Sequence, residues 1–144
     1  MPLNFVHPIH RATHRIGLYL DGLREPGLTQ GEAHILALLA HSAPATVADL
    51  HRGLAHKRST LTSILDRLVE RGLITRQVDK ADRRSFVIMP TAKGQKLARR
   101  VSRHLSKLER TVVRRVQAAD IKGFNKVVEA LEQEAHHASL AKRR

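Results

Sequence analysis

The stretch RSTLTSILDRLVERGLI, residues 58–74, is the clearest helix in this 144-residue sequence, and the fold prediction starts from it. Its apolar residues recur at the spacing i, i+3, i+4, i+7 and i+8, which places them on one helix face: Leu61, Ile64, Leu65, Leu68 and Val69. Gly72 is suited to the left-handed residue that ends a helix, with Leu73 packing back on the last turn. We therefore predict an amphipathic helix that buries this stripe.

The face opposite the stripe is rich in short hydroxyl side chains. It carries Ser59, Ser63 and Asp66, flanked by Thr60, Thr62 and Arg67. Solvated helix faces usually favour Glu and Lys, whereas Ser and Thr allow a close approach and arginine binds phosphate or guanine. We interpret this face as a DNA-contacting surface, with an ordinary solvated face as the alternative.

A β-hairpin is predicted directly after this helix. The β-prone runs LITRQV (73–78) and SFVIM (85–89) form its arms, DKADRRSF (79–86) forms a charged tip, and Pro90 ends the second arm. Before the helix, Thr46 and Asp49 form an acidic variant of a capping box, which starts a short helix buried through Val47, Leu50 and Leu54. Two short helices and a hairpin indicate a winged helix-turn-helix, whose second helix enters the major groove.

Longer helices flank this unit on both sides. One begins at Pro8 and ends near REPG (24–27), and a second runs over 30–41 behind a Thr29/Glu32 capping box. Thr91 caps a fifth helix with an apolar face: Leu97, Val101, Leu105, Leu108, Val112 and Val116. A sixth, AADIKGFNKVVEALEQEA, is buried through Phe124, Val127, Val128 and Leu131. We predict a mainly α chain with an N-terminal dimerisation helix (1–27), a winged domain (28–92) and C-terminal dimerisation helices (93–144).

The excess of positive charge is confined to the middle of the chain. Lys and Arg number 3 against 4 Asp and Glu in residues 1–50, 18 against 5 in 51–115, and 5 against 4 in 116–144. Such a block repels itself unless a polyanion neutralises it, so nucleic acid or an acidic membrane surface is the leading partner and a solvated face the alternative. The fifth helix is especially basic, because Glu109 is its single acid among nine cations from Lys93 to Arg115.

Several functional classes are disfavoured. The absence of cysteine excludes disulfides and thiol chemistry, and the sequence has no GxSxG, phosphate-cradling glycine loop or paired carboxylates in an apolar setting. We therefore expect no enzymatic activity and no cofactor. The longest apolar run, ILALLA (35–40), is far shorter than the ~20 residues of a spanning helix, and no secretory segment opens the chain. We expect a cytoplasmic protein without a membrane partner.

Over nearly its whole length, the sequence resembles the multiple-antibiotic-resistance regulator (MarR) family. The resemblance lies in five stretches that follow one another at the expected separations: LTQGEAHILALLA, TVADLHRGL, STLTSILDRLVERGLITR, DKADRRSF and PTAKGQKL. It implies an obligate homodimer on double-stranded DNA, in which the first, fifth and sixth helices form the joint and two winged domains straddle a palindromic operator.

The resemblance also assigns roles around the predicted wing. The family uses an Asp-x-Arg at the wing tip to place an arginine in the minor groove, which here matches Asp82 and Arg84. From its position beside them, we expect Arg83 to contact phosphate. Where the family usually has a Ser or Asp cap before its recognition helix, this chain has Lys57, which cannot accept an amide hydrogen bond. We therefore expect the helix to start near Arg58. The predicted DNA contacts are Lys57, Arg58, Ser59, Thr60, Thr62, Ser63, Arg67, Asp82, Arg83 and Arg84.

Ten histidines raise the question of a metal. His10 and His14 are spaced i, i+4 with Asp21 seven residues further on, and His34, His41 and His104 lie on the second and fifth helices, but no strong ligand motif such as HExxH is present. The family takes small anionic or phenolic effectors in a cleft between the first, second and fifth helices, and a zinc-sensing branch ligates metal there. We predict no metal site and an effector cleft lined by Arg11, His14, Arg15, His34 and His104.

The leading hypothesis is a homodimeric, sequence-specific transcriptional regulator, more often a repressor, that an effector releases from its operator. One alternative is a basic architectural or RNA-associated protein whose affinity comes from charge alone. With four aromatic residues in the chain, base stacking is a poor explanation for single-strand binding. Another alternative is a metal-responsive regulator of the same family.

Overall fold

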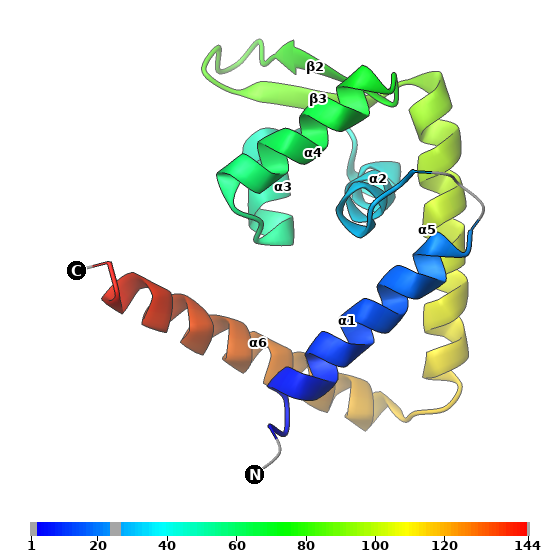
Figure 1. Ribbon diagram of the computed structural model, residues 1–144, viewed down its shortest axis with the longest axis vertical. Coiled ribbons are helices and arrows are strands. Elements are labelled where there is room, and N and C mark those ends of the chain that lie inside the picture. Colours follow the sequence, from blue (N-terminus) through cyan, green and yellow to red (C-terminus); the bar gives the residue numbers. More distant parts are fainter. Residues whose placement is uncertain (1–2, 24–26, 144) are drawn as a thin grey trace. The chain divides into compact units, whose positions relative to one another are not determined.

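The computed structural model describes residues 3–23 and 27–143, and these fold into helices with one small sheet (Figure 1). The chain divides into two compact units, one of residues 11–105 and the other of residues 1–10 with 106–144. Helices α1 (Val6–Asp21) and α5 (Ala92–Val113) each begin in one unit and end in the other. Within the described residues, no helix is both long enough and apolar enough to span a bilayer.

The winged part of the larger unit contains three helices and three strands. Helices α2 (Gln30–Ser42), α3 (Val47–Leu54) and α4 (Arg58–Glu70) pack with β1 (Ala45–Thr46), β2 (Ile74–Val78) and β3 (Phe86–Pro90). The strands form an antiparallel sheet in the order β1-β3-β2. The predicted winged helix-turn-helix is confirmed, although the two-residue strand β1 was not anticipated.

One apolar core holds these elements together. Leu36 and Leu39 of α2, Leu50 of α3 and Ile88 of β3 are buried in a single cluster. From α4 the cluster takes Leu61, Ile64, Leu65 and Leu68. The prediction that Val69 belongs to this stripe was wrong, because the Val69 side chain is 41% exposed. At i+8 it lies at the edge of the helical stripe, about 80° from Leu61, where the partner elements no longer cover it.

Both ends of α4 follow the sequence prediction. The helix begins at Arg58 behind Lys57, whose side chain makes no capping hydrogen bond. At the other end Gly72 adopts a positive φ of 69°, the Gly72 N–H donates to the Val69 carbonyl, and the Leu73 N–H donates to the Leu68 carbonyl. These paired bonds satisfy the last carbonyls of α4 and turn the chain into β2.

The capping box of α3 is also confirmed. The Thr46 Oγ1 accepts a hydrogen bond from the Asp49 N–H at 3.0 Å, and the Asp49 Oδ2 accepts one from the Thr46 N–H at 3.1 Å. The bond from the Thr46 backbone is the main reason why the pKa of the Asp49 carboxyl lies below its usual value. A charged Asp49 at this position also suits the positive end of the α3 dipole.

A second, smaller cluster joins three helices inside the larger unit. Leu20 of α1, Ala33 of α2 and Val101 of α5 are buried together. The Tyr19 hydroxyl adds a hydrogen bond to the His104 carbonyl at 3.0 Å. Helix α1 begins at Val6, two residues before Pro8, and ends at Asp21, before the predicted stop near residues 24–27, of which 24–26 lie outside the described residues.

The smaller unit leaves its apolar side chains uncovered. Helix α6 (Ala118–Ala141) is longer than predicted, and α5 ends at Val113, so that Val116 lies in the connection. The prediction that Phe124 is buried is not met in the single chain, where its side chain is 61% exposed. Val127, Val128 and Leu131 are only partly covered. The apolar spacing was recognised correctly, but a single chain supplies no surface to cover that face.

Candidate nucleic-acid interface

The Ser/Thr face of α4 is exposed to solvent, although Asp66 and Arg67 on it also form ion pairs with Arg76 and Glu32. All six of its polar residues are exposed: Ser59, Thr60, Thr62, Ser63, Asp66 and Arg67. Lys57 and Arg58 are exposed at the start of the helix, where the amides of the first turn have no side-chain cap. Two cations and the positive end of the α4 dipole therefore give this end of the helix a favourable potential for phosphate.

The end of α4 is anchored to the start of α2 by a buried carboxylate. Glu32 is 2% exposed, and its Oε1 accepts a hydrogen bond from the Arg67 Nε at 3.0 Å. The Arg71 Nη1 donates to the Glu32 Oε2 at 3.2 Å and to the Gly27 carbonyl at 2.9 Å. Of the predicted Thr29/Glu32 capping box, the bond from the Glu32 N–H to the Thr29 Oγ1 is present, at 3.2 Å. The predicted box is therefore only half formed, since the Glu32 carboxylate binds the two arginines and does not cap α2.

Replacing Glu32 with glutamine tests this anchor. The substitution preserves the shape of the side chain but removes the charge that both guanidinium groups share. Because both arginines are partly exposed, water offsets part of the loss, and we expect the free energy of unfolding to fall by about 1–2 kcal/mol. Urea denaturation measures the change, and Glu70→Gln, at an exposed position of α4, is the control. Equal stability of the two variants would contradict the anchoring role.

A second ion pair connects α4 to the wing. The Arg76 Nη2 on β2 donates to the Asp66 Oδ1 at 2.9 Å, and the Arg76 guanidinium lies 5.7 Å from the centre of the Phe86 ring on β3. Sequence reasoning did not single out Arg76. The alternation of side chains along β2 could have placed it on one face, but its partner on α4 follows only from the packing of helix against sheet. Asp66 and Arg76 together fix the exposed face of α4 relative to the hairpin.

The tip of the wing is ordered by its aspartates. The Asp79 Oδ1 accepts a bond from the Ala81 N–H at 3.0 Å, and the Asp82 Oδ1 accepts one from the Arg84 N–H at 3.0 Å. The Arg84 Nε lies 3.9 Å from the Asp82 Oδ1, and the Arg84 side chain is 97% exposed. Asp82 therefore shapes the backbone of the turn and remains within ion-pair distance of the guanidinium. Arg83 beside it is also exposed.

The structure assigns individual contacts to some of the residues predicted for an effector cleft. Arg11, His14 and Arg15 lie on the exposed side of α1. The His34 Nδ1 lies 2.9 Å from the Gln30 carbonyl, and the backbone carbonyl of His104 accepts the Tyr19 hydroxyl. Among residues 3–23 and 27–143, no group of three or more His, Cys, Asp or Glu side chains is placed to hold a metal ion.

Comparison with known proteins shows a partial match to a family model and a shared fold. Residues 28–86 match the sequence model of the MarR family. No curated protein matches the chain closely enough to count as a relative.

Among solved structures, MepR from S. aureus in a DNA-binding conformation matches with a TM-score of 0.81 and 20% identity, over 92% of this chain and 99% of that one. The S. aureus MepR–DNA complex matches with 0.78 and 20%, over 93% and 99%. The PcaV transcriptional regulator from Streptomyces coelicolor, in complex with its natural ligand, matches with 0.75 and 18%, over 92% and 94%. At these identities the comparison establishes a common fold.

Proposed function

We propose that this chain, whose residues 28–86 form a MarR-family domain, is a homodimeric regulator of transcription that reads a palindromic DNA operator. Helix α4 enters the major groove, and the hairpin tip enters the neighbouring minor groove. The chain acts as a repressor, which a small anionic or phenolic effector releases. The proposal requires binding alone and no catalysis.

The observation that carries this proposal is the exposed face of α4. That helix buries Leu61, Leu65 and Leu68 completely, while its Ser/Thr side faces solvent beside a hairpin that carries exposed arginines. Short hydroxyl side chains admit the close approach that base contacts need, and cations at the helix start suit the flanking phosphates. Asp66 and Arg76 hold the two elements in one arrangement, so they can dock together.

Salt titration on matched duplexes tests operator reading. A preferred duplex is first selected from a random pool, and the affinities for it and for a scrambled duplex are then measured over a range of salt concentrations. Operator reading predicts that both affinities fall with salt while the preference for the selected sequence, on the order of 10³-fold or more, persists. Comparable affinity for both duplexes at every salt concentration would instead indicate a basic architectural protein.

Replacing Arg84 with alanine tests the role of the wing. Loss of a minor-groove arginine is expected to weaken binding to the selected duplex by roughly 1–3 kcal/mol and to leave the dimer intact. Fluorescence anisotropy at fixed salt measures the affinity. Lys80→Ala is the control, because it removes one exposed cation from the same loop. Unchanged affinity, or a loss equal to that of Lys80→Ala, would reject a specific role for Arg84.

The proposed dimer is supported by the uncovered apolar side chains of the smaller unit. Phe124 and Ile121 of α6 are exposed together with Val112, Val113 and Val116 at and beyond the end of α5. Large contiguous apolar surfaces are rare on monomeric proteins and mark interaction sites. A second copy would cover them and would place two winged domains on the two halves of a palindrome.

Replacing Phe124 with glutamate should disrupt this dimer. Burial of one phenylalanine is worth about 1.5–3 kcal/mol. Because a two-fold symmetric dimer contains Phe124 twice, the substitution removes this contribution at two positions. The dimer dissociation constant should therefore rise by about 100-fold or more. Analytical ultracentrifugation measures the association. Gln133→Glu is the control, because position 133 lies on the opposite side of α6 and is exposed. A Phe124→Glu protein that remains dimeric would rule out this interface.

The effector, the location and the domain limits belong to the same proposal. Arg11, His14, Arg15, His34 and His104 are the proposed effector contacts, and a cytoplasmic location follows from the proposed role. Residues 1–27 and 93–144 would serve dimerisation, and residues 28–92 would bind DNA. The support for a ligand is that PcaV, which shares this fold, was solved with its natural ligand. Mass spectrometry of material that copurifies with the chain tests for an effector.

A further inference from the structure

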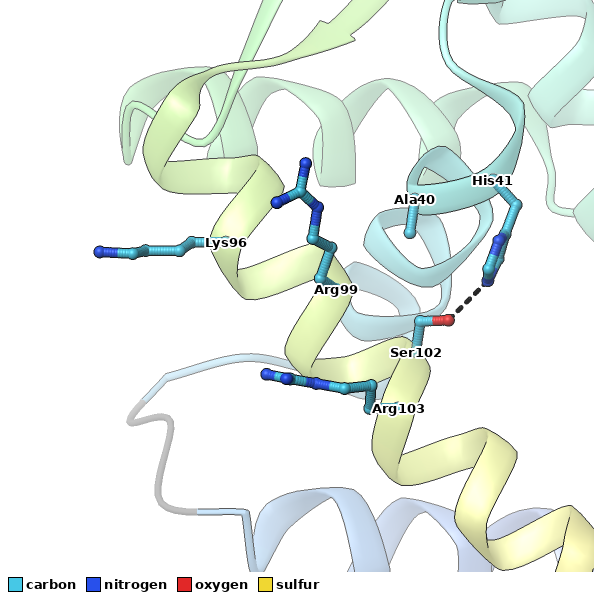
Figure 2. A pocket seen from close by; sticks show the side chains of 6 residues that line it. All are labelled: Ala40, His41, Lys96, Arg99, Ser102 and Arg103. Carbon is cyan, nitrogen blue, oxygen red and sulfur yellow. Dashed lines mark hydrogen bonds between the residues drawn. The ribbon is translucent and has the colours of Figure 1, made fainter.

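A cationic hollow lies between the end of α2 and the first half of α5. Six residues line it (Figure 2): Ala40, His41, Lys96, Arg99, Ser102 and Arg103. Its volume is about 400 Å³, a size that accommodates a small molecule. All six residues belong to the unit of residues 11–105, so the hollow is formed within one chain.

The polar lining consists of potential hydrogen-bond donors, and no carboxylate contributes to it. Lys96, Arg99 and Arg103 follow one another at i, i+3 and i+7, which places their side chains along one side of α5. None of the three joins an ion pair in the part of the chain that the structure describes. The His41 Nε2 at the end of α2 lies 2.6 Å from the Ser102 Oγ on α5. Figure 2 marks this contact between the two helices.

We propose that this hollow binds a small anion that carries two or more phosphate groups. Three neighbouring cations repel one another unless an anion neutralises them. Arginine presents a planar fork of donors that matches phosphate oxygens, and lysine adds a point charge. A single phosphate group would reach one arginine fork, whereas a diphosphate can contact Arg99 and Arg103 together. The hydrogen-bonded pair of His41 and Ser102, which joins the end of α2 to α5, can then supply one further hydrogen bond.

The hollow is distinct from both surfaces of the proposed regulator. None of the residues proposed for the effector cleft lines it. The tip of the wing and α5 lie at opposite sides of the larger unit in Figure 1, so a duplex held by α4 and the wing has its main contacts elsewhere. Anion binding in this hollow therefore does not depend on DNA binding, and it can regulate the protein separately.

Isothermal titration of inorganic pyrophosphate into the full chain tests the proposal. We expect saturable binding of one pyrophosphate per chain, and a shift of the His41 side-chain resonances, which a His41→Gln variant identifies. Arg99→Gln combined with Arg103→Gln should weaken binding by about tenfold or more, because two charge-assisted contacts are lost. Orthophosphate should bind more weakly than pyrophosphate.

The control variant combines Arg110→Gln with Arg114→Gln, which removes the same charge at exposed positions outside the hollow. Its pyrophosphate affinity should stay close to that of the parent chain. Equal weakening in the two double variants, or binding without a response from His41, would overturn the proposal in favour of diffuse charge. The affinity of the same variants for a DNA duplex is also measured. Loss of duplex affinity in the Arg99/Arg103 variant, without pyrophosphate binding to the parent chain, would assign these arginines to DNA phosphates instead.

Discussion

Replacing Gly94 with alanine is expected to lower the free energy of unfolding by at least the upper end of the roughly 1–3 kcal/mol that overpacking usually costs. A Cβ at this position would lie 1.7 Å from the Leu73 carbonyl oxygen and 2.6 Å from the Leu73 carbonyl carbon. Both are backbone atoms, so no side-chain rotation relieves the clash. The first turn of α5 would have to move away from the turn that connects α4 to β2.

That movement would break a set of hydrogen bonds. The Thr91 N–H donates to the Leu73 carbonyl at 3.0 Å, and the Thr91 hydroxyl donates to the Gly72 carbonyl at 2.7 Å. The Gly94 N–H donates to the Thr91 Oγ1 at 3.0 Å and caps α5. One close contact therefore joins the end of α4, the hairpin of β2 and β3 and the start of α5, and a substitution there affects all three elements.

Urea denaturation followed by circular dichroism measures the effect of Gly94→Ala. The control is Gly53→Ala in α3, where the nearest atom to an added Cβ is the Leu38 Cδ2 at 3.6 Å, an ordinary contact. Because alanine is the better helix former, Gly53→Ala should leave stability unchanged or raise it by about 0.5–1 kcal/mol. If the two variants unfold at the same urea concentration, the result would contradict the close contact between Gly94 of α5 and the Leu73 backbone.

The elements that sequence reasoning predicted well are those whose signals are local. The stripe of α4 from Leu61 to Leu68, the Thr46/Asp49 box and the left-handed Gly72 each depend on residues within one or two helical turns. The hairpin was equally predictable, because two β-prone runs flank a charged tip and Pro90 ends the second run. These local preferences are kept in the fold because the tertiary packing favours the same conformations.

The features that sequence reasoning missed depend on partners far away in the chain. Strand β1 has two residues and exists because Ala45 and Thr46 pair with Ile88 and Val87. The sequence pattern predicted Glu32 as a capping residue, yet its carboxylate binds arginines that lie 35 and 39 positions away. Arg76 was missed because its partner, Asp66, lies on another element. The spacing of apolar residues along the sequence gives no information about such pairings.

The side chains of the candidate interface were easier to predict than the contacts that support them. Exposure of the Ser/Thr face follows from the opposite apolar stripe, since a helix that buries one side shows the other. The apolar face of α6 was predicted from the same kind of spacing, but in the single chain this face is exposed and not buried. Spacing identified Phe124 as an apolar-face residue, but it did not tell whether the same chain or a second copy covers that face.

Replacing Ser63 with glutamate should abolish recognition of the selected duplex. Ser63 lies near the middle of the exposed face of α4, opposite the buried Leu61 and Leu65, so a longer carboxylate there can reach the groove without disturbing the core. Placing a negative charge against phosphates and base acceptors costs several kcal/mol, so we expect a loss of affinity of about 100-fold or more. Fluorescence anisotropy with the selected duplex measures this loss.

Two variants separate the effect of position from that of charge. Ser63→Ala removes the hydroxyl without adding charge, and should weaken binding far less than the glutamate. Ser139→Glu makes the same substitution on α6, at an exposed position outside the proposed interface, and should leave affinity nearly unchanged. Circular dichroism should show that all three variants remain folded, since both positions are exposed. A Ser63→Glu protein that still binds the selected duplex as tightly as Ser139→Glu would mean that α4 does not enter the groove, and that sequence is read by another surface.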